Sequence, residues 1–155
     1  MNKDELNKIL KLHKKWLDEE EGGVRADLQH ADLQRADLQD TNLLWAYLQD
    51  ADLQRADLKY ADLQYADLQR ADLKYADLQR ADLRDADLRG ADLDHSCFPL
   101  WCGSKGVKLD RRLFLQLVAH ICAVDVDDEE CKQVQAQLTP LAIQSHVAWF
   151  LLGDE

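Results

Sequence analysis

The strongest constraint on the fold of this chain is a repeat of five residues. From Ala26 to Leu93 the sequence repeats the unit Ala-Asp-Leu-x-x, with leucine at the third position of every unit. The repeated leucines are Leu28, Leu33, Leu38, Leu43, Leu48, Leu53, Leu58, Leu63, Leu68, Leu73, Leu78, Leu83, Leu88 and Leu93, which makes fourteen units. Phe98 takes the leucine position in a fifteenth, degenerate unit.

This period does not fit a single long helix or strand. In an α-helix each step of five residues turns the side chain by about 140°, so the leucines would point all round the helix. In an unbroken strand the side-chain period is two, so successive leucines would face opposite sides. A three-residue extended piece followed by a two-residue bend places every alanine and leucine inward and the aspartate between them outward. We therefore expect each unit to form one wall of a narrow tube.

Four such walls at right angles would close one coil, so that each unit lies over the fourth unit before it. Successive coils would pair their backbones in parallel at about 4.8 Å, with the right-handed sense of parallel crossover connections. At about 1.5 to 3 kcal/mol for each buried leucine, the core would supply on the order of 20 to 40 kcal/mol against chain entropy. The sequence thus predicts a mainly β fold, a right-handed quadrilateral parallel β-helix, held without metal or disulfide.

The N-terminal segment has a different pattern. Residues 4–20 show the three- and four-residue apolar spacing of an amphipathic helix, which we expect to end at Gly22-Gly23. An open coil would expose its leucine core and a row of unpaired backbone groups. Residues 1–24 are therefore predicted to form an N-terminal capping helix for the β-helix of residues 25–98.

The C-terminal segment, residues 99–155, is predicted to be a helical capping or dimerisation module. A helix is expected over residues 109–124 with Asp110 near its N-cap, a second after residue 127 or 128, and a third from Pro140 to about residue 152. The last helix carries apolar side chains on two sides, and its candidate interface residues are Trp149, Phe150, Leu151 and Leu152. Either the helix of residues 109–124 covers both sides or a homodimer forms.

The charge of the chain limits its partners. It carries 30 acidic and 19 basic side chains, a formal net charge of −11, so its long-range field repels nucleic acid and anionic membranes. The sequence has no apolar run of about 18 residues, and its start, MNKDELNKIL, lacks the apolar stretch of a signal peptide. A cytoplasmic location is expected.

The sequence offers no recognisable catalytic, cofactor or metal site. The five histidines are scattered, and GxSxG, HExxH and phosphate-binding glycine loops are absent from the sequence. The four cysteines, Cys97, Cys102, Cys122 and Cys131, have no repeated CxxC spacing, so we interpret them as reduced thiols. Stacking of every fourth unit would bring Trp45 over Tyr65 and place Arg35, Arg55, Tyr75 and His95 in one column.

The repeat resembles the A(D/N)LXX signature of pentapeptide-repeat proteins over residues 26–98, about half of the chain. The flanks are similar to those of bacterial members, with a helical cap before the repeats and a segment like SCFPLWCGS after them. The repeats are unusually uniform, so a regularised or engineered origin stays open beside a natural one. The resemblance implies a non-enzymatic β-helical scaffold or protein-interaction module without cofactor, metal or small-molecule substrate.

The same resemblance implies an alternative, a DNA mimic that binds and regulates a type II topoisomerase such as gyrase. Columns of outward aspartates would then imitate a phosphate backbone. Residues 25–98 contain 16 acidic and 9 basic side chains, and the arginines interrupt the negative field. The tube is also shorter than in gyrase-binding members and has no inserted loop. We therefore favour solvated aspartates that hydrogen-bond the nearby turn backbone.

Overall fold

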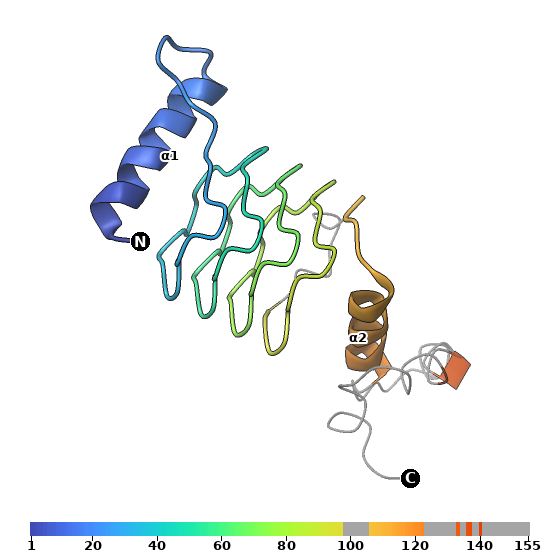
Figure 1. Ribbon diagram of the computed structural model, residues 1–155. Coiled ribbons are helices and arrows are strands. Elements are labelled where there is room, and N and C mark those ends of the chain that lie inside the picture. Colours follow the sequence, from blue (N-terminus) through green and yellow to red (C-terminus); the bar gives the residue numbers. More distant parts are fainter. Residues whose placement is uncertain (98–105, 123–132, 134–135, 138–139, 141–155) are drawn as a thin grey trace. The chain divides into compact units, whose positions relative to one another are not determined.

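The computed structural model describes residues 1–97, 106–122, 133, 136–137 and 140 (Figure 1). The chain divides into two compact units, Met1–Lys108 and Leu109–Glu155, which are described separately below. No helix in the described part of the chain is both long and apolar enough to cross a membrane.

Helix α1 spans Lys3–Leu17 and begins with a capping box. The side chain of Asn2 accepts a hydrogen bond from the Glu5 N–H, and the Glu5 carboxylate accepts one from the Asn2 N–H. The helix ends earlier than the expected Gly22-Gly23, because Glu19 turns to φ 55° and its N–H bonds back to the Trp16 carbonyl. Gly23 instead allows the chain to pass close to the helix, since a Cβ there would lie 2.6 Å from the Trp16 Cα.

Helix α1 lies against the N-terminal end of the coiled region, with Leu6 and His13 buried (Figure 1). The chain after the helix returns along it, and the Val24 N–H donates to the Leu12 carbonyl at 3.0 Å. The first residue of the coil is bound next, because the Ala26 N–H donates to His13 Nδ1 at 3.1 Å. A histidine thus joins the helix to the first coil.

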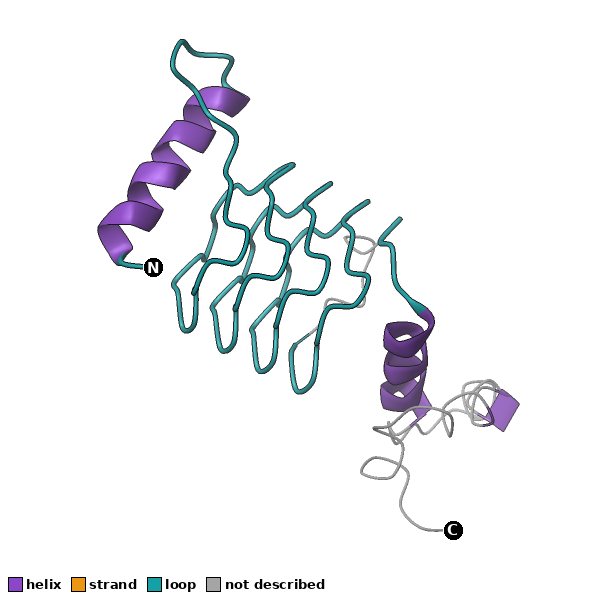
Figure 2. Cartoon of the chain, viewed as in Figure 1, coloured by secondary structure: helices purple, strands orange, loops and turns teal. Residues whose placement is uncertain are grey.

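Residues 26–97 wind into stacked coils, in which each unit pairs with the fourth unit after it. Parallel bridges join each second residue of a unit to its equivalent one coil later, from Asp27↔Tyr47 to Asp77↔Cys97. Around Leu63, for example, the N–H donates to the Asp82 carbonyl at 2.7 Å. Because each straight piece is very short, the described region forms single bridges without continuous strands, and Figure 2 draws it as loops and turns.

The interior of the coils is built from the repeated leucines and alanines. All fourteen leucines from Leu28 to Leu93 are buried, with at most 5% of any one exposed. Phe98, the expected last member of this set, lies outside the described residues. The alanines from Ala46 to Ala91 are buried beside them, whereas Ala31 and Ala36 in the first coil are partly exposed.

The bends have a fixed backbone geometry. In most units the N–H of the next unit's first residue donates to the leucine carbonyl, as from Ala31 to Leu28 at 3.2 Å. The fifth residue of the unit has positive φ, as type II turns require. Apart from Gly90, these residues are not glycine: His30, Arg35, Asp40, Trp45, Asp50, Arg55, Tyr60, Tyr65, Arg70, Tyr75, Arg80, Asp85 and His95, with φ between 55° and 65°.

The coil register continues beyond the boundary that we placed at residue 98. Lys108 pairs in parallel with Asp87 and exchanges hydrogen bonds with Leu88 and Ala86 at 2.9 and 2.8 Å. The earlier bridges predict that Asp87 would pair with residue 107, so one extra residue is accommodated between Cys97 and Lys108. The first compact unit accordingly extends to Lys108.

In the second unit, helix α2 spans Arg111–Cys122, so it begins two residues after the expected residue 109. Residues 123 and 124, where it was expected to end, lie outside the described residues. The expected N-cap is confirmed, because Asp110 Oδ1 accepts a hydrogen bond from the Leu113 N–H at 2.9 Å. Leu113, Leu115 and Val118 are buried, and Phe114 is exposed. Of the two further helices, only residues 133, 136, 137 and 140 are described, and these are helical. The proposed interface Trp149, Phe150, Leu151 and Leu152 lies outside the described residues.

Candidate interaction surfaces

The outward aspartates stabilise the turns. In each unit that has Asp or Asn in second place, the side-chain Oδ1 accepts a hydrogen bond from the N–H two residues later, at 3.0 to 3.3 Å. This confirms the expected side-chain bonding to the turn backbone. The column aspartates from Asp52 onward are less solvated than expected, since they are only partly exposed, whereas Asp27, Asp32 and Asp37 in the first coil are exposed. Asp87 is buried.

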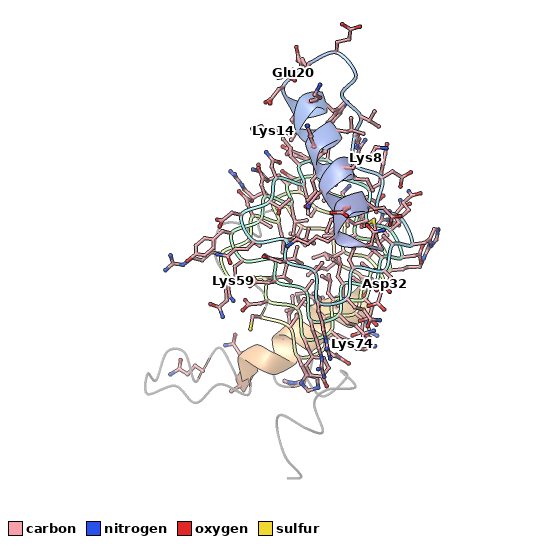
Figure 3. The ribbon with its side chains drawn as sticks, turned by 90° about the vertical axis from the view of Figure 1, so that its left-hand side faces the viewer. Lys8, Lys14, Glu20, Asp32, Lys59 and Lys74 are labelled. Atoms are coloured by element: carbon pink, nitrogen blue, oxygen red, sulfur yellow. The ribbon has the colours of Figure 1, made fainter. Side chains whose placement is uncertain are left out.

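Cations neutralise much of the acidic surface. Lys59 lies between two aspartates of one column, with Nζ 3.4 Å from Asp57 and 2.9 Å from Asp77. Lys74 repeats this arrangement between Asp72 and Asp92, at 3.5 and 2.9 Å. Both lysines are labelled in Figure 3. The hydrogen bond with Asp77 is the main reason that the pKa of Lys59 is raised.

Three arginines each bind one aspartate. The guanidinium of Arg70 makes two hydrogen bonds to Asp50, at 2.7 and 2.6 Å, which lower the pKa of the Asp50 carboxyl. Arg84 and Arg89 each bind the aspartate two residues earlier in their own unit, at 2.5 Å. The acidic columns are therefore interrupted by local ion pairs and differ from a continuous row of negative charge.

Aromatic and basic side chains also stack in columns. The rings of Trp45 and Tyr65 lie 4.3 Å apart and nearly parallel, as the four-unit spacing predicted. The second predicted column, two units further round the coil, also shows stacking, with Tyr75 on His95 at 4.9 Å and Arg55 over Tyr75 at 5.4 Å. These stacking and cation–π contacts restrict the large side chains on the surface.

An aromatic corner, defined as Trp45, Tyr47 and Tyr65, lies near α1. The three rings remain 43%, 36% and 41% exposed. Arg25 lies 3.6 Å over the Tyr47 ring, donates to its hydroxyl at 2.8 Å, and binds the Trp45 carbonyl. The repeat pattern did not indicate a role for Tyr47 in a site. The available signal was the departure of residues 41–47, TNLLWAY, from the repeat consensus.

A second feature is an open cleft between the first turn of α1 and the first coil. Its volume is about 510 Å³. The cleft is lined by Met1, Asn2, Lys3, Leu6 and Asn7 from the helix region and by residues 32–37 from the coil. It lies where the first coil has no preceding coil to pair with.

The histidines and cysteines are dispersed over the described residues. His13 is buried, and burial followed by the charge of Arg25 lowers its pKa, which the nearby Leu44 carbonyl partly opposes. His30 and His95 are exposed, and Cys97 is an exposed free thiol. In the described part of the chain, no three metal-binding side chains lie together. Cys102 and Cys131 lie outside it.

Comparison with known proteins places these features in a family. The family model for pentapeptide repeats matches eight copies, over residues 26–64, 36–74 and 66–99. A pentapeptide repeat protein from the cyanobacterium Cyanothece 51142 is 36% identical over 56% of this chain and 58% of its own, with a TM-score of 0.46. One from the Arabidopsis thaliana thylakoid lumen is 30% identical over 58% and 70%, with a TM-score of 0.40.

A third similar structure is QnrB1, a plasmid-mediated fluoroquinolone resistance protein. It is 20% identical over 66% of this chain and 71% of its own, with a TM-score of 0.24. No curated protein matches the sequence significantly. This chain aligns with less than two thirds of the length of the Cyanothece protein.

Through its central repeats the chain belongs to the pentapeptide-repeat family. Members of this family form right-handed β-helices. The parallel bridges found here, between residues four units apart, agree with such a fold.

Proposed function

We propose that this protein is a non-enzymatic β-helical scaffold whose aromatic corner binds another protein. The observation that supports the proposal is the exposure of Trp45, Tyr47 and Tyr65 on a rigid ladder. Aromatic side chains and arginine are enriched at protein interfaces. The aromatic side chains bury large areas and lose little conformational freedom. Arg25 already fixes the Tyr47 ring, so part of the ordering cost is met before binding.

The alternative is a DNA-mimic regulator of a type II topoisomerase. An excess of acidic side chains in the repeats supports it. The ion pairs of Lys59, Lys74 and Arg89 weaken it, because they neutralise aspartates within the columns. We therefore expect gyrase supercoiling to be unaffected at micromolar protein, and dose-dependent inhibition would favour the alternative.

The proposal is tested by affinity capture from bacterial lysate with matched variants. Trp45→Ala combined with Tyr47→Ala should abolish capture of the partner. The control is Tyr75→Ala, which removes a similarly exposed ring from the column of Arg55 and His95. Equal capture by both variants would reject the aromatic corner as the interface.

A further inference from the structure

Helix α1 leaves two walls of the first coil uncovered. Ala31 and Ala36 are partly exposed, whereas Ala51 and Ala56, which occupy the same positions one coil later, are 1% exposed. The cleft of about 510 Å³ lies at these two walls. The helix therefore caps the coil incompletely.

In the second coil, the backbone groups of the second residue in each unit pair with the preceding coil, which the first coil lacks. Asp57 N–H donates to the Ala36 carbonyl at 2.9 Å, and the Asp57 carbonyl accepts from Leu38 at 2.8 Å. Among the described residues, neither the N–H nor the carbonyl of Asp37, the equivalent residue in the first coil, has such a partner. The Asp32 carbonyl on the neighbouring wall accepts a hydrogen bond from the Met1 nitrogen at 2.8 Å, so groups at this edge can bind a donor.

The lining of the cleft indicates how an occupant would be recognised. Ala36 supplies partly exposed apolar surface, and the buried side chains of Leu6 and Leu33 lie behind it. The lining carries three positive groups, the Met1 ammonium, Lys3 and Arg35, against the two carboxylates of Asp32 and Asp37, so it has only a slight positive excess and no concentration of one sign. A volume of this size is within the range of about 300 to 1,000 Å³ found for ligand sites. Main-chain pairing along the open edge is therefore the recognition that this cleft provides.

We propose that the open edge binds an extended peptide segment of a partner protein, which adds one wall to the first coil by β-augmentation. Main-chain hydrogen bonds to Asp37 would supply affinity, and a small apolar side chain of the peptide would contact the partly exposed Ala36. This inference rests on the proposed role in protein interaction and assigns it a second surface. The partner segment must be extended and must present donors and acceptors in the spacing of one repeat unit.

The test uses the full chain and a fluorescein-labelled peptide, ADLKYADLQY, which has the sequence of residues 56–65. Binding is measured by fluorescence anisotropy. The same peptide with alternate backbone nitrogens methylated keeps its side chains but loses main-chain donors. We expect the unmodified peptide to bind and the methylated one to bind at least about tenfold more weakly.

Two protein variants locate the binding. Asp37→Pro removes the edge N–H and should weaken binding at least about tenfold, whereas Asp37→Ala keeps that N–H and should remain within about threefold. Asn7→Trp should fill the cleft from the helix side and also weaken binding. Its control, Lys11→Trp, places the same ring on an exposed helix position outside the lining.

Several results would overturn the inference. The first is no binding up to about 1 mM peptide, which means a binding free energy weaker than about 4.1 kcal/mol. The second is equal binding of the methylated and unmodified peptides. The third is unchanged binding to the Asp37→Pro and Asn7→Trp variants. Self-association that Asp37→Pro abolishes would assign the edge to a second copy and also overturn it. Loss of peptide binding with capture through the aromatic corner intact would reject the edge alone.

Discussion

The core of the coil is tested most directly by shortening one central leucine. Leu63 is fully buried, and its neighbours in the same column, Leu43 and Leu83, are equally buried. Leu63→Ala should destabilise the protein by about 2 to 5 kcal/mol, the range for buried leucines elsewhere. The position within that range depends on how far the surroundings can close the cavity.

The structure favours the upper part of this range. The Leu63 N–H bonds to the Asp82 carbonyl in the following coil at 2.7 Å, and the Asp62 N–H bonds to the Thr41 carbonyl in the preceding coil at 3.0 Å. These backbone bonds fix the wall on both sides, so it cannot move inward without breaking them. We therefore expect a loss of about 3 to 5 kcal/mol, measured by urea titration monitored by far-UV circular dichroism.

Gln64→Ala is the matched control. Gln64 is the next residue, but its side chain lies outside the tube and is only partly covered. The change should alter the free energy of unfolding by no more than about 0.5 kcal/mol. Comparable losses for the two variants would refute the assignment of inward and outward positions.

Three further predictions concern the turn, the helix cap and the C-terminal tail. Asp40 has φ 55°, so Asp40→Val should cost about 1 to 2 kcal/mol in a thermal or urea titration while Asp40→Gly is tolerated, and equal costs would contradict the role of backbone strain. His13 has a folded-state pKa below its ordinary 6.5. The contribution of neutral His13 to the free energy of unfolding should therefore be fully present above pH 6.5 and decrease as the pH drops toward the folded-state pKa. His13→Asn should lack this acid-dependent loss in urea titrations at successive pH values, and an unchanged pH dependence would reject it. We also propose a homodimer through the C-terminal helices. Light scattering after size exclusion should give twice 17.8 kDa and a lower mass for Phe150→Asp, whereas a monomer mass at all concentrations excludes the dimer.

The repeat region was the most predictable part of the chain, because one local rule applies to every unit. The five-residue period alone indicated which side chains point inward, and the four-unit register then placed Trp45 on Tyr65 and Tyr75 on His95. Such columns follow from counting, since each bend has the same geometry. The family was therefore recognisable from the sequence.

The remaining features depend on contacts between segments, which a period does not encode. The predicted end of α1 at Gly22-Gly23 was too late. The helix ends before a left-handed turn at Glu19, and glutamate usually favours continuation of a helix. The pairing of Lys108 with Asp87 was missed because an extra residue breaks the count after Cys97. The cleft beside Asp37 also required the position of α1 on the first coil.

The uniform core has a consequence for insertions and deletions. Because every wall presents leucine at the same position, removing one five-residue unit would still leave each leucine stacked on a leucine. The surface would change instead, since each later residue would move to a different wall relative to the earlier coils. Deletion of residues 66–70, for example, would bring Arg80 next to Arg55 in place of Tyr75, which now stacks there at 5.4 Å. Gain or loss of whole four-unit coils would preserve the surface columns, whereas quarter-coil steps would produce new surfaces on an unchanged core.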